Sequence, residues 1–185
     1  PGITSPLDRP ALAWRIHLGQ WMAWVDAQSG LLLDRTLMGD TLDLETWSGD
    51  GSQSSGSLRG DTSPYYISDD IDEEEAEAHS YLVEYGSYLR EAFGRESIDD
   101  NGLKLRQTVQ YGTMSNAYWD GYGAYFGVGW ATRDIVGHEF THGLVDYTAD
   151  LVYSNQPGGL NESFADIFAV LIDRADWLQG EEASG

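Results

Sequence analysis

The sequence predicts an α+β protein, in which a β-rich N-terminal lobe is followed by a packed pair of helices. Residues 11–37 alternate apolar and polar side chains, which is typical of β-strands. Residues 69–94 begin with an acidic run and continue with apolar side chains at helical spacing, which predicts a helix. Residues 134–174 contain two further helical patterns, interrupted by Gln-Pro-Gly-Gly at 156–159.

Composition limits the kind of protein and the kind of site. The 185 residues are 41% hydrophobic and 12% aromatic, which suits one folded core or two small lobes. No apolar run is long enough to predict a membrane span. Because the sequence has no cysteine, disulfides and thiolate metal sites are excluded. A metal would therefore need His, Asp or Glu ligands, and the imidazole candidates are His17, His79, His138 and His142.

The charge balance excludes one class of partner. Net charge is −21, from 31 acidic and 10 basic residues. A phosphate backbone would be repelled, so we expect no nucleic-acid partner. The acidity itself is explained by a solvated surface, by adaptation to high salt, or by calcium sites. Pro1 is not an initiator methionine and no leader pattern follows it, so we expect a piece of a longer product.

The first elements are expected to be strands. Alternation from Trp14 to Leu18 and a second extended run at 21–26 precede a turn that ends at Gly30. Apolar residues restart at Leu31, so 21–37 is expected to be a hairpin. His17 lies within the alternating strand and is expected at the surface.

A polar segment separates this hairpin from the rest. Residues 48–64 are rich in Ser, Gly and Asp, which indicates a flexible linker or a processing loop. We therefore divide the chain into a β-hairpin segment at 1–47, this linker, and a larger lobe at 65–185.

The larger lobe should begin with a helix and continue with strands. The acidic run 69–77 leads into an apolar face, and Gly94 is expected to end the helix. His79, near the helix start, is expected to pack or to form a hydrogen bond. Residues 103–111 alternate like a strand, and the aromatic and glycine-rich stretch 116–130 suits a twisted edge strand.

Two helices should follow, from Asp134 to about Leu151 and from about Asn161 to about Arg174. The first contains His138 and His142, whose i, i+4 spacing places both imidazoles on one helix face, where they can reach one ion. Glu139 lies about 100° around the helix from His138 and can sit beside the metal as a base.

Glu162 and Asp166 extend this constellation onto the second helix. A reversal near Gly158 and Gly159 would let Glu162 face the histidine pair. Two His and one carboxylate leave a fourth position for water, as in catalytic zinc sites. Asp166 lies one turn after Glu162 and could accept the remaining N–H of a histidine. The alternatives are a helix whose histidines meet no metal and, for Asp166, a solvent-facing charge.

The segment DIVGHEFTHGLVDYTADLVYSNQPGGLNESFADIFAVLID, residues 134–173, resembles the active-site helix pair of the thermolysin family of neutral zinc metallopeptidases, the gluzincins. Asn116-Ala117-Tyr118-Trp119 resembles that family's substrate-binding edge strand. Residues 102–112 resemble the strand before it, and Ala78-His79 the start of its first helix. Residues 11–37 resemble the last hairpin of the propeptide that precedes these enzymes, so a zymogen is expected.

The resemblance implies zinc held by His138, His142 and Glu162. Glu139 would polarise the metal-activated water and pass its proton to the leaving amine. Tyr153 would stabilise the oxyanion; without the resemblance it is an ordinary core tyrosine.

The resemblance also assigns supporting roles. Asp166 and Asn161 would orient the histidines by hydrogen bonds. Asn116 and Ala117 would bind the backbone of an extended peptide, although Asn116 alone would be taken for a turn residue. Acidic residues similar to the family's calcium ligands are present, the alternative being a solvated acidic turn; they are Asp134, Asp173, Asp176 and Glu181.

The sequence departs from the family in three places. Gly127-Val128-Gly129-Trp130 lacks the acids of the family's Gly-Asp-Gly-Asp-Gly stretch, and the segment leading into the zinc helix is shorter. The sequence ends at Gly185, where the family continues into a helical C-terminal lobe. That lobe supplies the other cleft wall, a further oxyanion-binding histidine and most of the specificity pocket. We expect it to be a separate chain, to have been removed, or to be missing from a reduced relative.

The leading hypothesis is a zinc-dependent endopeptidase, extracellular by resemblance, that acts on a peptide or protein through a metal-activated water with Glu139 as general base. Its other expected partners are a separate C-terminal lobe or the rest of its propeptide. The alternative is a catalytically incomplete, peptidase-derived structural or binding module that retains the metal site. A third hypothesis, an acidic calcium-binding protein, predicts calcium-dependent melting without zinc.

Overall fold

A computed structural model describes residues 13–18, 21–27, 29, 32–37, 42–54, 56–62, 65–175 and 177–184. The chain divides into two compact units, at 1–41 and 42–185, which are described separately. The first unit contains an antiparallel sheet of β1 (Ala13–Leu18), β2 (Trp21–Asp26) and β3 (Leu32–Leu37) in that order. The expected hairpin at 21–37 is therefore confirmed.

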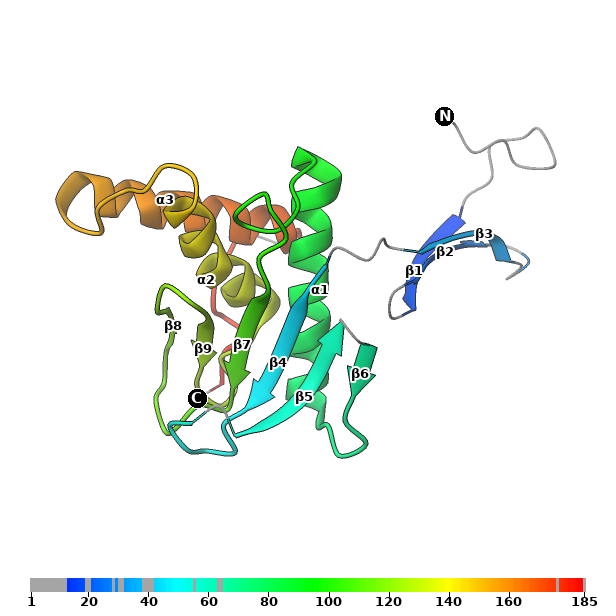
Figure 1. The fold of residues 1–185 in the computed structure, drawn as a ribbon, viewed down its shortest axis with the longest axis horizontal. Helices are drawn as coiled ribbons and strands as arrows, with labels where there is room; N and C mark the ends of the chain where they lie inside the picture. Colours follow the sequence, from blue (N-terminus) through cyan, green and yellow to red (C-terminus); the bar gives the residue numbers. More distant parts are fainter. Residues whose placement is uncertain are drawn as a thin grey trace. The chain divides into compact units, whose positions relative to one another are not determined.

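The second unit combines a six-stranded sheet with three helices (Figure 1). The strand order is β6-β5-β4-β7-β9-β8, with parallel pairing of β7 to both β4 and β9 and antiparallel pairing elsewhere. The strands are β4 (Leu44–Ser48), β5 (Ser57–Thr62), β6 (Tyr65–Ile67), β7 (Leu105–Val109), β8 (Ala117–Trp119) and β9 (Ala124–Phe126).

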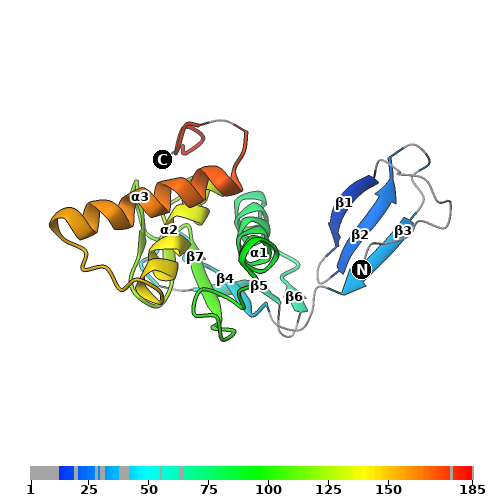
Figure 2. The same ribbon diagram turned by 90° about the horizontal axis from the view of Figure 1, so that it is seen from above.

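The helices α1 (Glu73–Phe93), α2 (Arg133–Asp146) and α3 (Asn155–Ile172) lie on one face of this sheet. Figure 2 shows α1 and α2 next to the strands, with α3 on the far side of α2. Leu82 of α1, Phe126 of β9 and Phe140 of α2 are fully buried between these layers. The mixed α+β class expected from the sequence is confirmed. No described helix is long and apolar enough to cross a membrane.

Helix α1 begins and ends as its sequence predicts. The Asp72 carboxylate accepts the backbone N–H of Glu75, and the Glu75 carboxylate accepts that of Asp72, which forms a capping box. Gly94 ends the helix in the left-handed conformation, with φ of 68°. Ala78, Leu82 and Leu89 form part of its buried face.

The linker expected at 48–64 must be corrected, because much of this segment belongs to the sheet. Strand β5 pairs with β4 on one side and β6 on the other. Its polar residues make specific contacts: the Arg59 guanidinium forms ion pairs with Asp50, Asp70 and Glu75. Gly60 is required where the His79 ring approaches, since a Cβ there would lie 2.7 Å from Nδ1.

The single edge strand expected at 116–130 is two strands. The Asp120 carboxylate accepts the backbone N–H groups of Tyr122 and Gly123, which closes a tight turn between β8 and β9. Strand β9 is interior, and β8 forms the edge of the sheet.

The boundary between the last two helices also differs from the expectation. Helix α2 ends at Asp146 rather than near Leu151, and α3 begins at Asn155 rather than near Asn161. The Gln-Pro-Gly-Gly stretch therefore forms the first turn of α3 instead of breaking the chain. Pro157 is tolerated because the N–H groups of a first helical turn have no partner within the helix.

Candidate metal centre

Helices α2 and α3 bring His138, His142 and Glu162 together. The two Nε2 atoms lie 3.1 Å apart, and Oε2 of Glu162 lies 3.3 Å from Nε2 of His138 and 3.7 Å from that of His142. Within the described part of the chain, these three residues are the one group of His, Asp or Glu side chains that could share a metal ion.

The separations between these three atoms fit zinc. Ligand bonds of 2.0–2.2 Å in tetrahedral geometry place neighbouring ligand atoms about 3.3–3.6 Å apart. The observed values of 3.1, 3.3 and 3.7 Å lie close to that range. Two imidazoles and one carboxylate are a donor set of catalytic zinc sites, which would leave a fourth ligand position for water.

Each histidine has a hydrogen-bond partner for its other ring nitrogen. Nδ1 of His138 lies 3.1 Å from Oδ1 of Asp166, and Nδ1 of His142 lies 2.7 Å from Oδ1 of Asn161. With these oxygens as acceptors, both protons reside on Nδ1 and both Nε2 lone pairs face the shared point. Burial is the largest influence on the pKa of His138 and lowers it, which favours the neutral, ligating form.

Glu139 lies beside the site and not in the ligand group. Its carboxylate is buried, and burial raises its pKa to about 7, with the nearby Glu162 charge adding to the increase. The backbone N–H of Trp119 donates to this carboxylate and partly opposes the rise. A carboxylate with a pKa near neutrality can both accept and release a proton at ordinary pH.

A cleft of about 660 Å³ runs over these residues. Strand β8 forms one wall of this cleft, and Asn116 and Ala117 are among the residues that line it. Tyr153 also lines the cleft; it is 64% exposed, and its ring lies 5.7 Å from that of His142 in an edge-to-face arrangement. Trp119 and Asp146 also line the cleft, and no sequence motif pointed to Asp146.

The calcium candidates do not form a comparable cluster among the described residues. The buried Asp134 carboxylate accepts hydrogen bonds from Thr132 and from the backbone N–H groups of Ile135 and Gly180. Asp173 accepts the backbone N–H of Ala175. Glu181 is exposed, and Asp176 lies outside the described residues.

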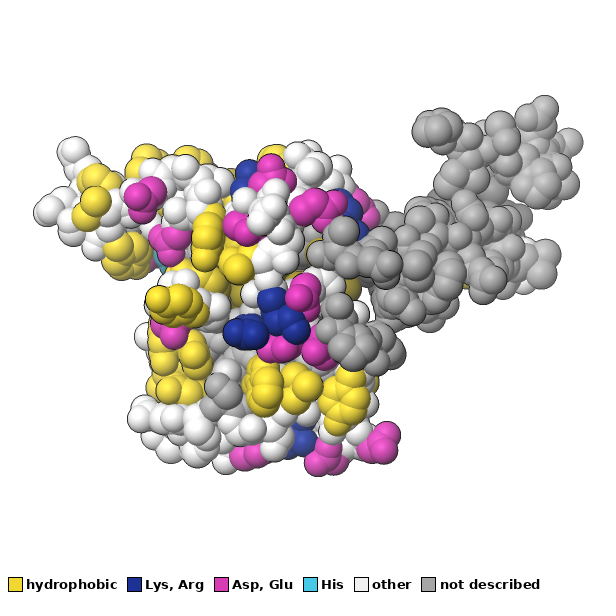
Figure 3. Space-filling view, viewed as in Figure 1, with side chains coloured by type: hydrophobic (Ala, Val, Ile, Leu, Met, Phe, Trp, Pro, Cys, Tyr) yellow, Lys and Arg dark blue, Asp and Glu magenta, His cyan; other side chains and the backbone are white. Residues whose placement is uncertain are grey.

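Several basic side chains are held in ion pairs. Lys104 lies 3.0 Å from Asp43 and 2.7 Å from Glu45, and Arg106 contacts Glu45 at 2.9 Å. On the face drawn in Figure 3, dark-blue basic side chains lie next to magenta acidic ones. The sequence as a whole has about three acids for each base, so its negative charge is not balanced.

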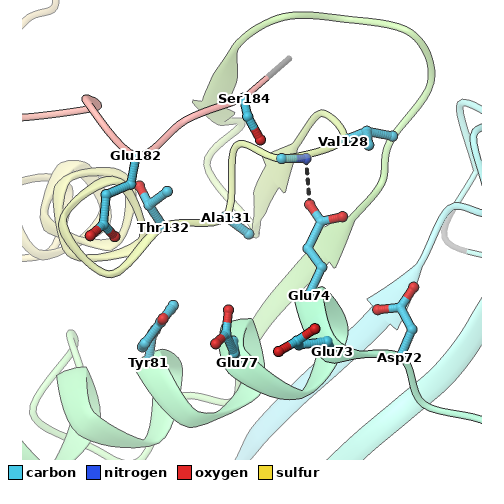
Figure 4. A pocket seen from close by; sticks show the side chains of 11 residues that line it. Asp72, Glu73, Glu74, Glu77, Tyr81, Val128, Ala131, Thr132, Glu182 and Ser184 are labelled. Atoms are coloured by element: carbon cyan, nitrogen blue, oxygen red, sulfur yellow. Dashed lines mark hydrogen bonds between the residues drawn. The ribbon is translucent and has the colours of Figure 1, made fainter.

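A second cavity, of about 540 Å³, is lined by several carboxylates. Figure 4 shows acidic side chains from the start of α1 facing Glu182 near the C-terminal end. Glu74 accepts the backbone N–H of Gly129 at 2.6 Å, and burial, as the largest influence, raises its pKa. No Lys or Arg is among the described residues that line this cavity.

Comparison with known proteins identifies related sequences over nearly the whole chain. Residues 25–146 match the family model "Thermolysin metallopeptidase, catalytic domain", and residues 149–185 match "Thermolysin metallopeptidase, alpha-helical domain". The metal centre is thus shared between the two matches, because α2 lies in the first and α3 in the second.

The chain is similar to Bacillolysin of Brevibacillus brevis, with 31% identity over 95% of this chain and 42% of the relative. It is 42% identical to Protease PrtS of Photorhabdus sp. (strain Az29), over 57% of this chain and 33% of that protein. Among solved structures, a precursor of protealysin from Serratia proteamaculans aligns with a TM-score of 0.66 and 30% identity, over 74% of this chain and 44% of its own. The chain spans less than half the length of these relatives.

Proposed function

Because this chain belongs to the thermolysin family of metallopeptidases, we propose that it forms the zinc-binding core of an endopeptidase. The observation that carries the proposal is the convergence of two imidazole nitrogens and a carboxylate oxygen beside a buried Glu139. Zinc held there would supply a Lewis acid that polarises a peptide carbonyl and activates a water. The ligands are His138, His142 and Glu162.

Glu139 acts as general base and then as general acid. Its burial keeps the carboxyl pKa near 7, so that it can take a proton from the attacking water and return it to the leaving amine. Tyr153 lies beside His142 in the cleft, from where we assign it to stabilise the oxyanion.

The remaining residues hold the reacting groups in place. Asp166 and Asn161 keep the proton of each histidine on Nδ1. Ala117 begins the edge strand β8, and Asn116 directly precedes it. Among the described strands β8 pairs only with β9, so an extended peptide can add to its other side.

Calcium and secretion are secondary parts of the proposal. Both derive from the resemblance to the family, calcium through Asp134, Asp173, Asp176 and Glu181. A calcium-dependent rise in melting temperature of the zinc-loaded chain would support this part, and identical melting with calcium and with a calcium chelator would contradict it.

The test of function is the Glu139→Gln variant of the zinc-loaded chain, assayed on a denatured protein. We expect the variant to keep zinc and to lose hydrolysis by about 10²–10⁴-fold, because the carboxylate is the base. Glu77→Gln, which changes an exposed carboxylate on α1, is the matched control and should retain activity. Undiminished turnover by Glu139→Gln would refute the mechanism. Zinc binding without hydrolysis by the unmodified chain would favour the binding-module alternative.

A further inference from the structure

Strand β8 has few contacts of its own to hold it in position. It is three residues long, lies at the edge of the sheet and pairs only with β9 among the described strands. Its last residue, Trp119, is nevertheless fixed to helix α2 at two points. Because α2 also carries the histidines and Glu139, these points join the peptide-binding wall to the metal helix.

The first point is the close approach of the Trp119 ring to Gly143. A Cβ added at Gly143 would lie 2.8 Å from Cζ2 of Trp119 and 2.9 Å from Cδ1 of Ile98. Real Cβ atoms do not approach other atoms so closely, so the ring can occupy this place only because residue 143 has no side chain.

The second point is a hydrogen bond at the end of α2. Nε1 of Trp119 donates to Oδ2 of Asp146 at 2.9 Å, and Asp146 is the last residue of the helix. The ring contact and this hydrogen bond together fix both the distance and the rotation of the indole relative to α2. The backbone N–H of the same residue donates to the Glu139 carboxylate.

We propose that Gly143 and Asp146 are positioning residues, which act through Trp119 to set the gap between strand β8 and the metal helix. This inference rests on the proposed function, because the gap determines where a peptide on β8 lies relative to Glu139. Neither residue needs to touch the reacting atoms. Loosening the contacts should let the edge strand drift, so that a smaller fraction of the molecules holds β8 in the position that binds a peptide.

Peptide affinity is the property most sensitive to this drift. We therefore expect Asp146→Ala to weaken binding of an extended hexapeptide by about three- to tenfold, the range that a lost net hydrogen bond produces. Asp146→Asn keeps an acceptor oxygen for the indole and should bind within about twofold of the parent. Gly143→Ala should weaken binding as Asp146→Ala does, because the ring must move.

The experiment measures hexapeptide binding to the full zinc-loaded chain by titration calorimetry, in a Glu139→Gln background so that nothing is cleaved. Asp69→Ala removes an exposed carboxylate elsewhere and controls for the lost charge. Trp119→Phe removes the indole N–H. The double variant Trp119→Phe with Asp146→Ala should therefore bind the hexapeptide no more weakly than Trp119→Phe alone. Steady-state kinetics of the same changes in the active chain should show a raised KM with kcat within about twofold.

Equal affinities for the Asp146→Ala and parent proteins would overturn the proposal. The proposal would also be overturned if Asp146→Asn lowered hexapeptide affinity as much as Asp146→Ala does. That result would mean that the charge of Asp146 matters and its acceptor oxygen does not. Failure of the Glu139→Gln chain to bind the hexapeptide also contradicts it. Absence of hydrolysis by the unmodified chain, with these binding differences intact, would contradict only the proposed function.

Discussion

Oδ1 of Asn161 lies 2.7 Å from Nδ1 of His142, and this contact joins the two helices that carry the metal centre. Both side chains are buried, with Asn161 only 1% exposed. A buried hydrogen bond of this kind leaves His142 one orientation and one tautomer, with the Nε2 lone pair directed toward His138 and Glu162.

Replacing Asn161 should therefore weaken the metal site without removing a ligand. We expect Asn161→Leu to lower zinc affinity by about 10–100-fold, the usual consequence of losing a partner that orients a metal ligand. Competition with a chromophoric chelator measures the zinc affinity. The control is Asn101→Leu, at an exposed position. An unchanged affinity in Asn161→Leu would mean that His142 is oriented by other contacts.

The metal site could be predicted from the sequence because local geometry determines most of it. The i, i+4 spacing places His138 and His142 on one face of any helix that contains them. Glu162 lies on the partner helix as expected, but within α3 and not at its start, because α3 begins at Asn155. The error arose because Pro157 and its neighbouring glycines are equally compatible with a chain break and with a first helical turn.

Contacts between distant segments could not be predicted in this way. Trp119 and Asp146 meet because β8 and α2 pack together, and neither residue shows a pattern that indicates the other. The linker assignment at 48–64 failed for a similar reason. Ser, Gly and Asp indicate flexibility when taken alone, yet β5 is paired on both sides and Arg59 is held by carboxylates distant in sequence.

The carboxylate of Glu74 should destabilise the fold when it is ionised. Burial raises its pKa above the ordinary value of 4.5, so the protein loses stability as the pH rises through that raised pKa. Glu74→Gln removes the charge and keeps an acceptor for the Gly129 N–H. Because Glu74 is only partly buried, we expect a gain of only about 1–2 °C in Tm at pH 7.

Calorimetry in low salt measures this gain, with Glu73→Gln, an exposed carboxylate at the same cavity, as the control. Repulsion by Asp72 and Glu75 is a smaller contribution to the raised pKa of Glu74. Added salt screens that repulsion and should therefore reduce only this part of the difference in Tm between the Glu74→Gln and parent proteins. A Tm below that of the parent at pH 7 would show that the charge of Glu74 is stabilising.

His79 should make the protein sensitive to acid. Burial lowers its pKa to about 4, and Nδ1 lies 2.9 Å from the Thr46 hydroxyl oxygen. The unfolded chain, with a pKa near 6.5, then binds a proton that the folded chain does not, so stability falls as the pH drops from about 6.5 to 4.

The His79→Phe variant cannot bind that proton. Its overall stability should be lower, but the dependence of the free energy of unfolding on pH should decrease by up to about 1.4 kcal/mol per pH unit between pH 4 and 6.5. Urea unfolding at several pH values measures the slope, with a chelator present so that metal binding does not contribute. Parallel curves for the two proteins would exclude His79 as the source.

Zinc stoichiometry tests the central claim most directly. The full chain, dialysed against a trace of zinc and then against metal-free buffer, is measured by atomic emission beside its His142→Ala variant. We predict one zinc per chain in the parent and a large loss in the variant, because a single carboxylate and one imidazole hold zinc weakly. Absence of zinc from the parent, or equal zinc in both proteins, would contradict a centre formed by His138, His142 and Glu162.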